Sequence, residues 1–141
     1  MRRVVCASPA YFAQHGSPVT PDDLQYRPAI TFGSVSAPGV WRFYSGSNEI
    51  DAVLRSRLSV NTSDAAVDAA IAGIGLARAN SYQVVDHVRR GVLALALEAF
   101  EPPPRPVNLI YNSHARLPLK LRAFIDFVTP RLRARLKAAA L

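Results

Sequence analysis

Cysteine, methionine and tryptophan each occur only once in this chain of 141 residues. The single cysteine, Cys6, excludes an internal disulfide and a zinc site built from several cysteines. No apolar run approaches the roughly 20 residues that a membrane-spanning helix needs. The amino terminus also lacks the apolar stretch and cleavage site of a secretory signal. These absences predict a cytoplasmic location and no association with a membrane.

Acidic residues are also scarce, and the shortage is confined to one part of the chain. The sequence has 17 Lys and Arg against 10 Asp and Glu, a net charge of +7. Over 1–88 the two signs balance, seven against seven, whereas 89–141 hold ten basic and three acidic residues. Much of the excess lies in 131–137, RLRARLK, which also carries apolar residues at helical spacing. A solvated helix is therefore the first interpretation of this segment, ahead of a surface that binds nucleic acid or a membrane.

Apolar residues are abundant: they make up half of the chain, and the length suits one compact domain. Short β-branched apolar runs alternate with capped helical segments. This alternation predicts an α/β fold with a mixed sheet. We expect strands at 3–7, 28–32, 40–44, 49–60, 76–79, 92–97 and 107–111.

Capping residues mark the starts of the expected helices. Ser8 and Thr20 each precede a proline, which suits the first position of a helix. A helix of small residues follows Asn61, and another follows Asn80. Pro130 is expected to break or kink the last helix. One face of that helix carries the apolar residues Leu117, Leu121, Phe124, Ile125, Val128, Leu132 and Leu136.

Motifs for catalysis and metal binding are missing from the sequence. The histidines His15, His87 and His114 lie far apart, so their spacing supports no metal site. Gly73 and Gly75 follow a helix, whereas a dinucleotide-binding glycine turn follows a strand and begins a helix. We therefore expect a protein that is not an enzyme and that needs no cofactor and no metal.

The segment VNTSDAAV is the best candidate for a binding site. Asn61, Thr62 and Ser63 follow a strand and begin a helix, which places backbone N–H groups and polar side chains together at a sheet edge. That arrangement suits an anion such as a carboxylate. The alternative is that one of these residues only caps the helix. Ser8 and Asn80 allow the same two interpretations, because each also precedes a helix.

Three segments that cover nearly the whole chain resemble LysR-type transcriptional regulators in the correct order. RRVVCASPAYFAQHGSPVTPDDL resembles the region that links the two halves of that family's effector-binding domain. RLSVNTSDAAVDAAIAGIGLARANSYQVVDHVRRG has the family's order of strand, small-residue helix, glycine turn, strand and helix. EPPPRPVNLIYNSHARLPLKLRAFIDFV resembles the return strand and the final helix.

The resemblance implies a domain organisation like that of periplasmic binding proteins, with two α/β subdomains, two crossover strands and a ligand cleft between the subdomains. Residues 8–106 would form the second subdomain, and 2–7 and 107–112 the crossover strands. Residues 113–141 would form a C-terminal helix that belongs to the first subdomain. The winged helix-turn-helix and most of the first subdomain would lie outside this sequence.

The implied function is that of a regulatory domain that senses a small, anionic effector and controls transcription. The family's dimers bind DNA through the winged helix-turn-helix, so this chain alone is expected not to read a DNA sequence. Two other functions stay open: a solute-binding protein of transport, and a free-standing nucleic-acid-binding module that uses the basic end. We also expect the final helix to self-associate or to dock on the chain's own sheet, because its apolar face needs a partner.

The same resemblance directs the choice of site residues. The part of the cleft that this chain contributes is expected to come from strand-to-helix junctions at one edge of the sheet. The residues predicted to bind the effector are Ser8, Phe32, Asn61, Thr62, Ser63 and Asn80.

Overall fold

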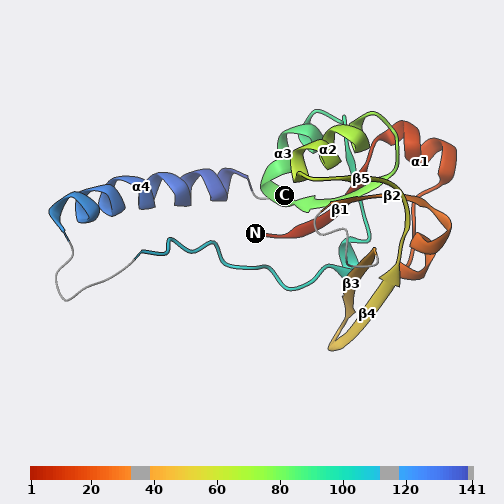
Figure 1. Ribbon diagram of the computed structural model, residues 1–141, viewed down its shortest axis with the longest axis horizontal. Helices are drawn as coiled ribbons and strands as arrows, with labels where there is room; N and C mark the ends of the chain where they lie inside the picture. The colour runs from red at the N-terminus through yellow and green to blue at the C-terminus, as the bar shows by residue number, and fades with distance from the viewer. Residues whose placement is uncertain (33–38, 112–117, 140–141) are drawn as a thin grey trace.

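The computed structural model describes residues 1–32, 39–111 and 118–139, with strands and helices in alternation (Figure 1). Leu117, expected on the last helix, lies outside the described residues. The elements are β1 (Arg3–Ala7), α1 (Pro9–His15), the 3-10 helix η1 (Pro21–Tyr26), β2 (Pro28–Phe32), β3 (Val40–Ser45), β4 (Asn48–Val53), β5 (Arg55–Val60), α2 (Ser63–Ile71), β6 (Leu76–Asn80), α3 (Ser81–Arg89), β7 (Ala94–Ala96), the 3-10 helix η2 (Glu98–Phe100) and α4 (Leu119–Ala138).

The main sheet is mixed, which confirms the predicted α/β class. Its five strands lie in the order β5-β2-β6-β1-β7. Strand β2 pairs in parallel with β5 and β6, whereas β1 runs antiparallel to both β6 and β7. A second sheet consists of the β3–β4 hairpin alone. The carboxyl ends of β2, β5 and β6 therefore meet at one edge of the main sheet, together with the amino end of β1.

Apolar side chains fill both faces of the main sheet. On one face, α2 and α3 pack against residues such as Val4, Cys6 and Ile30. On the other face, α1, the hairpin and η1 pack against residues such as Val5 and Leu76. The central strand β1 is buried on both sides, as its continuous apolar run predicts. Burial also raises the pKa of Cys6 to about 12, so its thiol stays protonated and is a poor nucleophile at neutral pH.

The first helix begins as its capping sequence predicts. The side chain of Ser8 accepts a hydrogen bond from the backbone N–H of Tyr11 at 3.3 Å, and Pro9 occupies the first helical position. Gly16 ends the helix with a φ of 72°, a conformation that costs glycine little. The segment after Thr20 forms a 3-10 helix, η1, again with a proline at its start.

The single strand expected at 49–60 is two strands separated at Leu54. Strand β4 pairs with β3, and β5 then leaves the hairpin to pair with β2. At the junction, the N–H of Leu54 donates to the carbonyl of Gly39 at 2.7 Å. Both halves have the residue pattern of a strand, so the pattern could not show that they join different sheets.

The strand expected at 107–111 is not formed. Among the described residues, 107–111 have no strand partner and are exposed, with Val107, Leu109, Ile110 and Tyr111 in contact with solvent. The strand expected at 92–97 is shorter, covering only Ala94–Ala96. An extended apolar segment becomes a strand only where a neighbouring strand supplies hydrogen bonds.

Helix α4 is continuous through Pro130, so of the expected break or kink the break is wrong. Both Pro130 and the residue four positions earlier, Asp126, are exposed, and water can therefore satisfy the carbonyl that loses its helical partner. Helix α4 has no buried residue and extends away from the sheet, so of the two expected outcomes docking onto that sheet is wrong, while self-association stays a prediction (Figure 1). Its end does reach α3, where Arg89 Nη2 donates to the carbonyl of Ala138 at 2.7 Å. Among the helices that the structure describes, none is long and apolar enough to cross a bilayer.

Candidate functional site

Five of the six predicted site residues lie along one edge of the main sheet. Phe32 ends β2 and pairs with Val60, the last residue of β5. Asn80 ends β6, which runs parallel to β2, and it pairs with Arg3 at the start of β1. The residues that lie at or directly after these strand ends are Phe32, Asn61, Thr62, Ser63 and Asn80.

Ser8 lies at the opposite edge of the sheet, so the expectation that it shares the edge with the others is wrong. Strand β1 is antiparallel to β6, and its carboxyl end therefore reaches the start of β6. A methyl group added at Gly73, in the turn that precedes β6, would lie 3.5 Å from the Ser8 hydroxyl oxygen. In this position Ser8 is buried and caps α1.

The start of α2 uses two of the predicted hydroxyl groups within the protein. Thr62 is the cap of this helix, and its Oγ1 accepts from the N–H of Ala65 at 3.1 Å. The Ser63 hydroxyl donates to Oε1 of Gln83 at 2.9 Å. The helix-start N–H groups of Ser63 and Asp64 remain as donors, because an α-helix supplies no internal partner for its first N–H groups. These two donors, with the partial positive charge of the helix start, suit an oxygen ligand.

Gln83 joins the starts of α2 and α3, a role that the sequence prediction missed. Its Oε1 accepts from the backbone N–H of Asn80 at 3.1 Å as well as from the Ser63 hydroxyl. Its Nε2 donates to Oδ1 of Asp64 at 3.1 Å. The spacing Asn80-x-x-Gln83 is that of a capping box, which is the signal that could have identified this residue. Gln83 therefore holds the two helix starts in a fixed relation.

The groups at this edge are suited to hydrogen bonding with a small polar ligand. They are hydroxyls, amides, backbone N–H donors and one exposed aromatic ring, Phe32. The carboxylate of Asp64 is exposed and adds one negative charge beside the α2 start. Within the described part of the chain, no three His, Cys, Asp or Glu side chains lie together as a metal centre requires. The edge can therefore orient a small polar ligand through hydrogen bonds.

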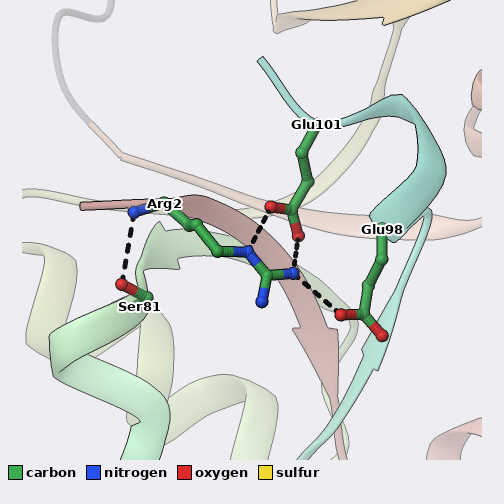
Figure 2. A network of polar contacts seen from close by, with 4 residues as sticks. All are labelled: Arg2, Ser81, Glu98 and Glu101. Carbon is green, nitrogen blue, oxygen red and sulfur yellow. Dashed lines mark hydrogen bonds and ion pairs between the residues drawn. The ribbon is translucent and has the colours of Figure 1, made fainter. Parts of the chain in front are cut away.

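A network of polar contacts ties the amino end of β1 to the same edge (Figure 2). The guanidinium of Arg2 contacts both carboxylate oxygens of Glu101, at 2.7 and 2.8 Å, and also Glu98 at 2.8 Å. Its backbone N–H donates to the hydroxyl of Ser81, and the N–H of Ser81 donates to the Arg2 carbonyl at 2.9 Å. The hydrogen bonds that Arg2 donates to Glu101 and then to Glu98 raise the pKa of Arg2. Strand β1, α3 and the turn after β7 are thus held together.

Replacing Glu101 by glutamine is expected to destabilise the protein by about 1–2 kcal/mol, since it removes the charge from a largely buried pair. The Glu101 side chain is 10% exposed, whereas that of Glu98 is 55% exposed. The matched variant Glu98→Gln is therefore expected to cost about 0.5 kcal/mol or less. Urea denaturation followed by circular dichroism measures both. Equal effects of the two substitutions would show that burial of the Arg2–Glu101 pair adds nothing.

A hollow in the described part of the chain lies away from the helix-start edge, which is the edge formed by Phe32, Asn61, Thr62, Ser63 and Asn80. This hollow, of about 720 Å³, lies between α3, residues 106–107 and the end of α4. Its lining includes Tyr82, Val85 and Leu136, but none of the five residues at the helix-start edge. At the helix-start edge itself, Phe32, Asn61 and Thr62 are exposed to solvent.

A mixed sheet with this topology, with helices on both faces and two helix starts at one edge, defines a periplasmic-binding-protein-like α/β domain. The family model described as the LysR substrate binding domain matches residues 1–133. The chain therefore belongs to the LysR substrate binding domain family.

The chain resembles curated relatives that are described as activators and as repressors of transcription. The HTH-type transcriptional activator AaeR of Escherichia coli strain K12 is 29% identical over 92% of this chain and 42% of its own length. An HTH-type transcriptional repressor of Pseudomonas aeruginosa strain UCBPP-PA14 is 30% identical over 86% of this chain and 39% of its own length. The chain spans less than half the length of these curated relatives.

Solved structures share the fold. CrgA, a LysR-type transcriptional regulator from Neisseria meningitidis, matches with a TM-score of 0.79 and 23% identity, over 93% of this chain and 45% of that chain. The regulatory domain of AphB from Vibrio vulnificus matches with a TM-score of 0.77 and 24% identity, over 92% of this chain and 64% of that chain. At these identities the likeness establishes the fold alone.

Proposed function

We propose that this chain is the ligand-sensing part of a LysR-type transcriptional regulator that acts in the cytoplasm and is not an enzyme. The observation that carries the proposal is the match of the family model over residues 1–133. The gathering of three strand ends and two helix starts at one sheet edge supports a ligand-binding role. Relatives described as an activator and as a repressor support the link to transcription.

The proposed domain organisation is the one that the resemblance to LysR-type regulators implies. Residues 8–106 are the second subdomain, 2–7 and 107–112 are the crossover strands, and 113–141 belong to the first subdomain. The exposed apolar side chains of 107–111 and the absence of any buried residue in the described part of α4 support this division. In a longer protein, the rest of the first subdomain would supply the strand that pairs with 107–111 and the surface that covers α4.

The proposed mechanism is a shift between two arrangements of a homodimer on DNA. DNA is bound by a winged helix-turn-helix that lies outside this sequence, so this chain contributes the effector response. An effector can shift the arrangement only by binding one of the two more tightly than the other. A ligand held between two subdomains meets this condition, because its contacts change when the subdomains move.

The proposed effector is a small organic anion that binds at Phe32, Asn61, Thr62, Ser63 and Asn80. The free helix-start N–H groups and the helix dipole favour a carboxylate at the α2 start. The exposed carboxylate of Asp64 opposes this preference. Its Oδ1 accepts a hydrogen bond from Gln83, so part of the negative charge faces the protein. The ring of Phe32 would supply apolar contact for the rest of the ligand.

The substitution Thr62→Asp tests this site without removing the helix cap. Aspartate caps a helix at least as well as threonine, so the domain is expected to stay folded. The added negative charge repels an anionic effector, and we expect the effector concentration for half-maximal induction to rise about tenfold or more. The measurement is reporter expression controlled by the full-length regulator.

The matched control is Thr62→Ser, which retains the hydroxyl and should respond like the natural protein. Operator binding in a gel-shift titration should be unchanged in both variants, because the DNA-binding segment lies elsewhere. If Thr62→Asp induces normally, the residues at this edge are helix caps only and the proposed site is wrong.

A further inference from the structure

The ends of α3 and α4 bring together much of the chain's positive charge. The net charge of +7 comes entirely from residues 89–141. Helix α4 carries four cations in 131–137, and α3 ends at Arg89, which Arg90 follows. Because Arg89 Nη2 donates to the carbonyl of Ala138, the two helix ends lie side by side (Figure 1). We call this region the basic junction, and its residues are Arg89, Arg90, Arg131, Arg133, Arg135 and Lys137.

Most of these charges are not neutralised within the protein. Among the described residues, the cations of the basic junction that form no ion pair with a carboxylate are Arg90, Arg131, Arg133, Arg135 and Lys137. Arg131 donates to the carbonyl of Phe127 at 2.8 Å, and its guanidinium carbon lies 3.6 Å from the centre of that ring. These contacts orient the side chain but leave its charge in place. Elsewhere in the chain, by contrast, Arg2 and Arg42 do pair with carboxylates.

The four cations at the end of α4 form two rows along the helix. Residues four positions apart lie on the same side of a helix, so Arg131 and Arg135 form one row. Arg133 and Lys137 form the other row for the same reason. Like charges at this spacing repel each other and destabilise a helix slightly. A dense array of negative charge outside the helix would offset that repulsion.

The apolar side chains at this end of α4 are directed at α3, which argues against a membrane as the source of that negative charge. Leu132 and Leu136 line the hollow between α3 and α4, together with Val85. Arg133 and Lys137 do not line it and are exposed to solvent. A helix that binds a membrane interface needs its apolar face free to enter the lipid. Exposed cations without a free apolar face suit a hydrophilic polyanion instead.

Double-stranded DNA has a charge density that fits the basic junction. Residues 131–137 span about 9 Å of helix at 1.5 Å per residue. A DNA duplex carries about five phosphates over that length of its axis. The planar guanidinium group of arginine also matches phosphate oxygens in geometry and in charge. A regulator of transcription, which is the function proposed above, works beside DNA.

We propose that the basic junction binds the backbone phosphates of double-stranded DNA without regard to base sequence. Reading a sequence requires side chains held against base edges in a groove, whereas phosphate contacts require only placed charge and hydrogen-bond donors. The exposed arginine and lysine side chains of α4 supply the second kind of contact. This contact adds to the DNA binding of a winged helix-turn-helix outside this sequence. It does not depend on the effector site at the helix starts.

Fluorescence anisotropy of the complete chain with two labelled DNA duplexes of unrelated sequence tests the proposal over a series of salt concentrations. We expect both duplexes to bind equally, within about twofold, and the logarithm of Kd to rise with that of salt with a slope of about 3–5. The double variant Arg133→Gln with Lys137→Gln should weaken binding about tenfold at low salt and reduce the slope by about 2. Glutamine forms helices about as well as arginine and lysine, so α4 is expected to persist.

The matched control is the double variant Arg55→Gln with Arg57→Gln on β5. It removes the same net charge from two other exposed positions, at the edge of the main sheet. We expect it to change the affinity for DNA by less than about twofold, because these residues lie outside the basic junction. The comparison therefore separates a defined surface from an effect of net charge alone.

Four results would overturn the proposal: no binding of DNA at low salt, equal losses in the two double variants, a clear preference for one duplex, or tighter binding to anionic vesicles. The vesicles contain phosphatidylglycerol and phosphatidylcholine in equal parts and are tested by co-sedimentation at the same salt. Circular dichroism verifies that each variant is folded. If the α4 double variant is not, Lys137→Gln alone replaces it, and an unchanged salt slope for that variant overturns the proposal. Thr62→Asp should bind DNA like the natural chain, so failure here leaves the effector proposal untouched.

Discussion

Gly75→Ala is expected to destabilise the protein by about 3 kcal/mol, because the added methyl group has no room. A Cβ at Gly75 would lie 2.6 Å from the carbonyl oxygen of Pro28 and 3.0 Å from its carbonyl carbon. These are backbone atoms of β2, which cannot turn aside as a long side chain can. Relief of the clash therefore requires β6 to move away from β2, at the centre of the sheet.

The matched control is Gly46→Ala in the hairpin turn. Gly46 has a φ of 63°, and a Cβ there would meet nothing within 4 Å. Only the backbone conformation opposes alanine, so the expected cost is about 1 kcal/mol. Urea denaturation, followed by the fluorescence of Trp41, measures both free energies of unfolding. A Gly75→Ala variant as stable as Gly46→Ala would mean that β2 and β6 are not packed as closely as described.

Local signals predicted most of the elements. Ser8 with Pro9, and Thr62 with the small residues that follow it, mark helix starts that the structure confirms. The apolar run after Arg3 predicted a strand buried on both faces. These signals act over a few residues, through capping bonds and through the period of apolar side chains. Where local and long-range interactions favour the same structure, the sequence alone is sufficient to predict the element.

Elements that depend on distant partners were predicted less well. The run 49–60 has the pattern of a strand throughout, but whether its halves pair with β3 or β2 depends on where the chain turns. The run 107–111 also has that pattern, yet no strand pairs with it among the described residues. Pro130 lies in a helix that is exposed, so the helix tolerates it. In each case the deciding interaction involves a partner or solvent that the local pattern does not specify.

In the candidate site, too, features set by local sequence were predicted and features set by distant parts of the chain were not. The rule that strand ends and helix starts meet at one edge placed Asn61, Thr62 and Asn80 correctly, because β2, β5 and β6 are parallel. The rule failed for Ser8, because nothing in its local sequence shows that β1 runs in the opposite direction. Arg78 was within a correctly predicted strand, but only the structure shows that its side chain is buried over aromatic rings.

Phe43→Ala is expected to destabilise the protein by about 3–5 kcal/mol, which is the usual cost of removing a fully buried aromatic side chain. Phe43 is 1% exposed and is the largest of the fully buried side chains. It belongs to the cluster that joins the β3–β4 hairpin to the main sheet, together with Tyr11, Leu24 and Leu76. The hairpin shares no strand ladder with the main sheet among the described residues, so side-chain packing has to hold it in place.

The matched control for Phe43→Ala is Val53→Ala on β4, where the side chain is 65% exposed and the expected cost is about 0.5 kcal/mol. Thermal and urea denaturation followed by circular dichroism give both free energies. Trp41 fluorescence gives a second reading, because Trp41 lies on the same strand as Phe43 and should become solvated if the hairpin detaches. A cost below about 1 kcal/mol for Phe43→Ala would show that the hairpin is held by other contacts. The Arg78 side chain, which lies over the same ring, would then need a different explanation for its burial.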